Sequence, residues 1–190
     1  MRFLRILQST TLLSVLLAAL TVFGQVETID ARARGTSTQM GADFDVKVTI
    51  NQYSSSEDRA ILTAAFQKGG NDELAKALSK MKAVGRLSLP STVGYSLGYA
   101  RSIPTPTGRK IRFITDRPIA IAEQWGMTRS EQYSLTAGEI DINDQDKDKS
   151  TGVLFPAAKL KVNKDGDLEF ELFKNPWKLT HILDWSKGTK

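Results

Sequence analysis

The chain has 190 residues, of which 41% are hydrophobic and 25% charged, with no cysteine, one histidine and a formal net charge of +5. These values are typical of a globular protein with one core. The lack of cysteine excludes disulfides, thiol catalysis, iron–sulfur clusters and lipid attachment at an N-terminal cysteine, and a lone histidine disfavours a zinc centre. No phosphate-binding glycine loop or serine-hydrolase elbow occurs, so neither of those enzyme classes is indicated.

Residues 1–24 have the pattern of a secretory signal peptide. Arg2 and Arg5 precede an apolar run from Leu12 to Phe23, which is shorter than the roughly 20 residues of a membrane-spanning helix. We therefore expect export to the periplasm or the medium, cleavage near Gln25 and no stable membrane span afterwards. A permanent N-terminal anchor is the alternative. Because no basic stripe with interleaved aromatic residues occurs, a nucleic-acid partner is not expected.

The remaining chain is expected to form one domain. Residues 25–40 are polar and lack an apolar period, which predicts a flexible leader. The domain is placed at 41–187 and is predicted to begin with a strand at 44–50, where apolar and polar residues alternate.

Two short helices are predicted next. Ser54 and Glu57 have the spacing of a capping box, Gly69 and Gly70 end the first helix, and Asn71 caps the second. The apolar residues with helical spacing are Ile61, Leu62, Ala65, Phe66, Leu74, Ala77, Leu78 and Met81.

Strand patterns dominate the chain after Gly85. The sharpest prediction is a hairpin over 153–173, turning at Lys164-Asp165-Gly166. A three-residue loop there sets Leu160 opposite Phe170 and matches both the apolar and the charge pattern. The predicted fold class is α+β, with a helical hairpin packed on a curved, mostly antiparallel sheet of about seven strands.

Several short segments between residues 111 and 183 resemble a family of small exported bacterial proteins of uncharacterised function. The segments are 111–119, 130–133, 152–154, 158–161, 168–171 and 176–179. The resemblance implies an exported bacterial protein and implies no catalytic activity.

A ligand-binding surface is predicted on the strand that begins at Tyr95. Tyr95, Tyr99 and Arg101 are expected on one face, and Arg112 joins them if residues 93–115 form a hairpin. Such an aromatic and cationic surface suits a carboxylate or a sugar. On the opposite face, small residues at 94, 96 and 98 leave space either for a ligand or for a closely packed helix, and we favour the helix.

Two further clusters suggest chemistry. The oxygen-rich run 141–148 could hold calcium, but Lys149 replaces the turn glycine of an EF-hand and Phe155 its bidentate glutamate, so we favour a solvated loop. His181 could act in acid–base catalysis with Glu123, Glu131 or Asp184, although a lone histidine is more often structural. No catalytic residue, metal or cofactor is therefore assigned.

The sequence favours a non-catalytic domain of the cell envelope that binds a small amphipathic ligand or a protein partner. One alternative is a carboxylate-dependent enzyme. The other is a structural domain that assembles through an exposed strand edge.

Overall fold

The computed structural model describes residues 26–36, 43–119, 135–164, 166, 168–170 and 176–186, and its strands pair antiparallel throughout. The elements are β1 (Glu27–Arg34), β2 (Asp43–Ile50), α1 (Ser56–Leu78), β3 (Gly85–Ser88), β4 (Tyr95–Thr105), β5 (Gly108–Thr115), β6 (Leu135–Asn143), the 3-10 turn η2 (Lys147–Lys149), β7 (Thr151–Ala158), β8 (Leu160–Val162), β9 (Leu168–Phe170) and β10 (Trp177–Asp184).

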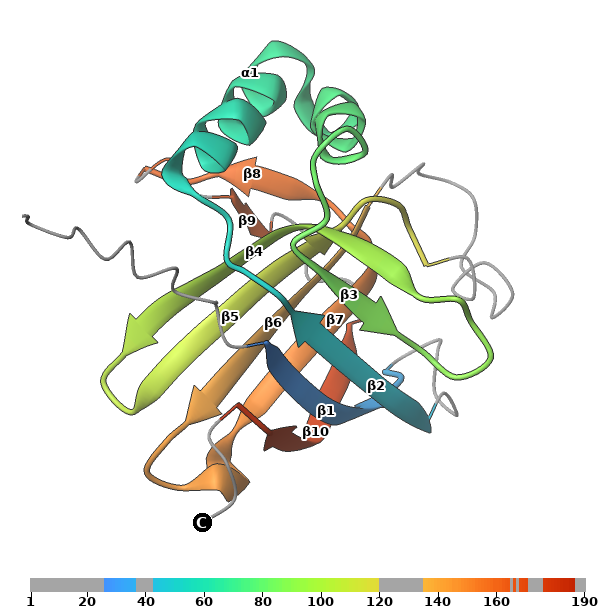
Figure 1. Cartoon of the computed structure of the whole chain (residues 1–190), viewed down its shortest axis with the longest axis vertical. Coiled ribbons are helices and arrows are strands. Elements are labelled where there is room, and N and C mark those ends of the chain that lie inside the picture. The colour runs from blue at the N-terminus through green and yellow to red at the C-terminus, as the bar shows by residue number, and fades with distance from the viewer. Residues whose placement is uncertain are drawn as a thin grey trace, which may run out of the picture.

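Eight strands close into a barrel in the order β1-β10-β7-β6-β5-β4-β3-β2, and β2 pairs with β1 again (Figure 1). The predicted fold, a helical hairpin on a curved sheet of about seven strands, is therefore wrong. Residues 56–78 form the single helix α1, which is broken by non-helical backbone angles at Gly69 and Gly70. The sheet closes because β1 adds a strand that pairs with both β2 and β10, so neither side of the sheet is left as an edge.

Strand β1 also corrects the predicted flexible leader, because residues 27–34 of that segment belong to the barrel. Glu27, Ile29, Ala31 and Ala33 are buried, and the residues between them are more exposed. The alternation is that of a half-buried strand. Its inward residues include two alanines and a glutamate, so they differ little in hydrophobicity from the outward residues. The sequence pattern therefore did not predict this strand.

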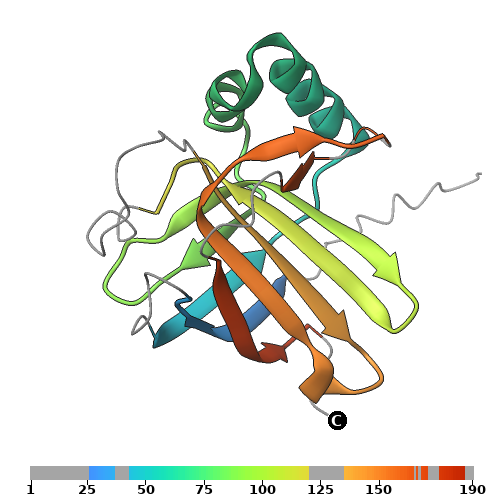
Figure 2. The same ribbon diagram turned by 180° about the vertical axis from the view of Figure 1, so that it is seen from behind.

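Apolar side chains form two layers, one inside the barrel and one outside it. The interior holds Trp177, Phe113 and aliphatic residues of β1 to β6. The outer layer lies where α1 and the β8-β9 hairpin cover the barrel, and it includes Leu74, Leu78 and Phe155. Figure 2 shows the chain bending from β7 into β8, which crosses beneath α1.

The predicted register of the β8-β9 hairpin is confirmed, but the hairpin is shorter than predicted. Leu160 pairs with Phe170 and Val162 with Leu168, and Gly166 has the expected positive φ of 75°. Residues 151–158 instead form β7, which pairs with β6 and β10 within the barrel.

The break at Gly69 and Gly70 divides α1 into a first limb before it and a second limb after it, and hydrogen bonds fix both limbs. The N-terminal cap is Ser55 rather than Ser54: its hydroxyl accepts from the Asp58 amide, and the Asp58 carboxylate accepts from the Ser55 amide. Beyond the break, the Asn71 side chain donates to the Leu160 carbonyl at 3.2 Å and accepts from the Leu160 amide at 2.9 Å. Asn71 therefore joins the second limb to β8.

Candidate functional site

The predicted ligand-binding residues are divided between the two faces of the barrel wall. Tyr95 is buried with the interior residues, whereas Tyr99 is buried in the outer layer beneath α1. The register of β4 against β5 shifts between Leu97 and Tyr99, and such a bulge turns the following side chains to the other face. The prediction that Tyr95 and Tyr99 share a face is therefore wrong.

Gly98, at the register shift, packs against α1, in agreement with the predicted helix. A Cβ at Gly98 would come within 2.9 Å of a Leu78 methyl group. Close packing of α1 therefore explains the missing side chain at this position.

Arg101 and Arg112 are cross-strand neighbours, as the predicted hairpin requires. Arg112, however, is committed to structural contacts: it donates to Glu139 at 2.7 and 3.0 Å and to the Leu168 carbonyl at 2.7 Å. Its guanidinium also lies 5.6 Å from the centre of the Phe170 ring. Arg112 thus holds the β8-β9 hairpin against the barrel.

Tyr99 and Arg101 meet at a small hollow of about 130 Å³ beside the start of α1, with Arg59 and Ser54 to Ser56. The serine hydroxyls already serve the local backbone and side chains. Ser54 accepts from the Ala100 amide and Ser55 caps α1. The hollow is well below the size of an ordinary ligand pocket, so it is not our candidate site.

Large side chains pack closely in the barrel interior at the positions that the structure describes. Phe113 faces Gly138 on the adjacent strand, and any Cβ at Gly138 would overlap the Phe113 ring. Trp177 is fully buried and meets Phe44 edge-on, with ring centres 4.9 Å apart. These contacts leave little room for a small ligand among the described interior side chains.

One end of the barrel carries a largely buried ionic cluster. Arg109 of β5 donates to Glu27 of β1 and to Asp184 of β10, each at 2.6 Å, and to the Ser186 hydroxyl at 3.2 Å. The exposed fractions of the Arg109, Glu27 and Asp184 side chains are 20%, 8% and 11%. The cluster joins β5 to strands on the other side of the barrel. No local sequence pattern predicts it.

Tyr53 extends this cluster toward solvent, and its hydroxyl donates to Glu27 at 2.5 Å. Burial, followed by the hydrogen bond to Glu27 and the charge of Glu27, raises the pKa of Tyr53 above its ordinary value of 10.0. The resulting stability is complete below pH 10.0 and is lost as the pH rises toward the higher pKa of the folded protein.

We expect Tyr53→Phe to flatten the alkaline limb of the stability profile, because phenylalanine has no proton to lose. Urea unfolding of both proteins at about pH 8 and about pH 11 measures the effect. At the lower pH the variant should be less stable by about 0.5–1.5 kcal/mol, the contribution of one hydrogen bond. An unchanged difference between the two proteins at both pH values would contradict the prediction.

The other two predicted chemical clusters make local contacts within the described residues, and Asp184 is paired with Arg109. His181 has a φ of 51° on β10, and its Nδ1 atom lies 3.2 Å from the Thr180 hydroxyl. Glu123 and Glu131 lie outside the described residues. Within the described part of the chain, no three metal-binding side chains cluster. In the acidic run, Asn143 and Asp146 accept from the loop's own amides.

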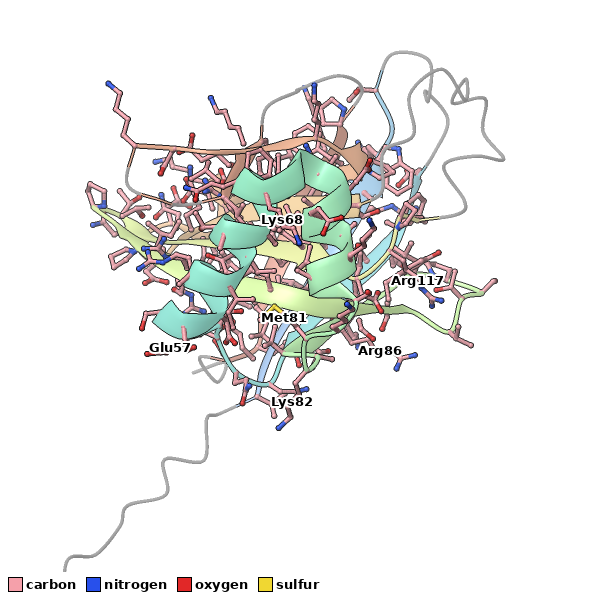
Figure 3. The ribbon with its side chains drawn as sticks, turned by 90° about the horizontal axis from the view of Figure 1, so that it is seen from above. Glu57, Lys68, Met81, Lys82, Arg86 and Arg117 are labelled. Carbon is pink, nitrogen blue, oxygen red and sulfur yellow. The ribbon has the colours of Figure 1, made fainter. Side chains whose placement is uncertain are left out.

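A groove of about 540 Å³ on the outer surface of α1 is the better candidate site. We name it the α1 groove. Its apolar side chains are Ile61, Ala65, Ala77 and Met81, and its charged side chains are Asp58, Lys68, Glu73, Lys76, Lys80 and Lys82. In Figure 3 Met81 lies between the two limbs of α1, with Lys68 and Lys82 on either side of it.

A second groove of about 520 Å³ crosses the outer face of β1, β2 and β10 near His181. Its charged side chains are balanced, with Asp30 and Asp45 facing Arg32 and Lys47. Arg32 contacts Asp45 at 3.1 Å and Lys47 contacts Asp30 at 3.6 Å. This groove therefore has less electrostatic preference than the α1 groove.

Comparisons with known proteins found no matching family model, no matching curated protein and no matching solved structure. Among the described residues, no helix is both long enough and apolar enough to cross a membrane.

Proposed function

We propose that this chain is a non-catalytic binding domain of the cell envelope, which binds a protein partner on the outside of its barrel. The pattern of residues 1–24 and the resemblance over 111–183 support export to the periplasm or the medium. The close packing of the described interior side chains favours a partner on the surface over a small ligand inside.

Closure of the barrel argues against the alternative of assembly through a strand edge. Each of the eight barrel strands has a paired neighbour on both sides, so less strand edge is open to a further strand than in an open sheet. The pairing is partial at two places, because β3 covers only residues 95–97 of β4 and β7 covers only residues 177–179 of β10. We therefore favour recognition of a partner by side chains.

The observation that carries the proposal is the α1 groove. Ile61 on this surface is 56% exposed, although the helix that bears it buries Leu62, Leu74 and Leu78 against the barrel. An open groove with apolar side chains and a charged rim is typical of protein recognition sites.

Site-specific photocrosslinking in the producing cells tests the proposal. A photoreactive residue at position 61 is expected to form an adduct with another polypeptide. The matched control is position 93, because Val93 is also an exposed apolar residue, 78% accessible, outside the groove. Equal crosslinking from both positions would contradict a specific site.

Native mass spectrometry of the mature chain from the same cells separates a protein partner from a small ligand. We expect no small-molecule mass that disappears on denaturation. Such a mass, together with no adduct from position 61, would favour a small-ligand function and overturn the proposal.

A further inference from the structure

The rim of the α1 groove carries more positive than negative charge. Its four lysines face two carboxylates, and one pair is internal, because Lys76 donates to Glu73 at 2.7 Å. Within the described residues, Lys68, Lys80 and Lys82 form no ion pair. Asp58, the other carboxylate, accepts from the Ser55 amide.

The charges of the lysines reach the groove's own carboxylate. The pKa of Glu73 lies below its ordinary value, chiefly because of the hydrogen bond and charge of Lys76, with the charges of Lys68 and Lys80 adding to the effect. The site therefore stabilises negative charge.

The groove is concave because α1 changes direction at Gly69 and Gly70. Gly70 has φ 62° and ψ −146°, angles that favour glycine. The break places the two limbs as walls, and Met81 lies between them in Figure 3. A concave surface accepts an inserted chain segment, whereas a flat bilayer favours contact with a protruding face.

Packing against the barrel holds this shape in the free protein. Leu74 and Leu78 of the second limb are buried, and Leu62 of the first limb is fully buried as well. Together with the two hydrogen bonds from Asn71 to Leu160, this packing means that little conformational ordering is needed on binding.

We propose that the α1 groove binds an acidic amphipathic segment of a partner protein. This inference rests on the proposed function and specifies the chemistry of the partner. Apolar residues of the segment contact Ile61 and Met81, and its carboxylates face Lys68, Lys80 and Lys82. This is the recognition of a helix in a groove, with charge providing selectivity.

Peptide binding to the mature chain tests the chemistry directly. The probe is a fluorescein-labelled amphipathic peptide of about four helical turns, with leucine along one face and glutamate on the other. Two matched peptides carry glutamine or lysine in place of glutamate. Fluorescence anisotropy is expected to show binding about tenfold tighter for the glutamate peptide than for the glutamine peptide. Salt should weaken the glutamate complex selectively.

Charge reversal in the groove should exchange the preference. Lys80→Glu combined with Lys82→Glu is expected to weaken the glutamate peptide about tenfold and to strengthen the lysine peptide. Lys178→Glu is the control, because Lys178 is an exposed lysine of β10 outside the groove. Thermal melts establish that each variant is folded.

A second pair of variants tests the apolar contact of the peptide with Ile61. Ile61→Ser is expected to weaken the glutamate peptide, and Val93→Ser to leave it unchanged. Equal binding of the glutamate and glutamine peptides would overturn the inference while leaving a crosslink from position 61, and hence the proposed function, intact.

Two further outcomes would overturn the inference of an acidic partner segment, because each would identify a different occupant of the α1 groove. One is sedimentation with phosphatidylglycerol vesicles that Lys80→Glu with Lys82→Glu abolishes. The other is self-association of the chain that the same substitutions abolish.

Discussion

Arg109→Met is expected to lower the free energy of unfolding by about 3–5 kcal/mol, the usual cost of removing one partner from a buried ion pair. Arg109 contacts both Glu27 and Asp184 at 2.6 Å. Without the guanidinium, two mostly buried carboxylates lose their counter-charge and remain near each other. Urea unfolding of the variant and the wild type at neutral pH measures the loss.

Further variants can separate the effect of the uncompensated carboxylate charges from the effect of lost packing. Adding Glu27→Gln and Asp184→Asn to Arg109→Met removes the uncompensated charges and should recover part of the stability. Arg109→Lys should be intermediate, because an ammonium keeps the charge but cannot offer the planar set of donors. A triple variant less stable than Arg109→Met would show that charge is not the cause.

The ionic cluster illustrates what the sequence could not reveal. Glu27, Arg109 and Asp184 are far apart in the chain, and each looks like an ordinary surface charge. They meet because β1 and β10 close the barrel, with Arg32 of β1 opposite Thr180 of β10. Such long-range pairing leaves no local pattern, so the sequence indicated neither β1 nor the closure of the barrel.

Local patterns succeeded where one face of an element is buried and the other exposed. Phe44 to Ile50 alternate in this way, and residues 43–50 form β2. The β8-β9 register was also predictable, because the apolar pairs and the pairing of Lys161 with Glu169 agree on one alignment.

The sequence did not predict the α1 groove, because the apolar spacing of a helix does not show which apolar residues stay exposed. Helical spacing groups Ile61 with Leu62 as buried residues, yet Leu62 is fully buried and Ile61 is 56% exposed. Lys80 and Lys82 lie beyond the end of α1 at Leu78, and both line the groove. Only the placement of the two limbs on the barrel distinguishes these roles. Tyr95 and Tyr99 were likewise assigned to one face, because the sequence does not reveal the register shift between Leu97 and Tyr99.

Gly138→Ala is expected to destabilise the barrel by about 1–3 kcal/mol, the usual range for overpacking a core. Gly138 of β6 is paired with Phe113 of β5, and its added methyl group would overlap the Phe113 ring. The φ of Gly138 is not positive, so alanine meets no backbone penalty there and the clash is purely steric. Urea unfolding measures the loss.

A double-mutant cycle with Phe113→Leu tests this cause. Phe113→Leu alone removes buried surface and should also destabilise the protein. In the Gly138→Ala background, however, the smaller side chain makes room for the new methyl group, so the double variant should be more stable than the two single losses predict. Strict additivity would mean that the Phe113 ring does not cause the loss. A Gly138→Ala variant as stable as the wild type would mean that the ring moves aside without cost, and that the barrel interior has more free space than its packing indicates. A small apolar ligand inside the barrel would then become a serious alternative to a partner on its surface.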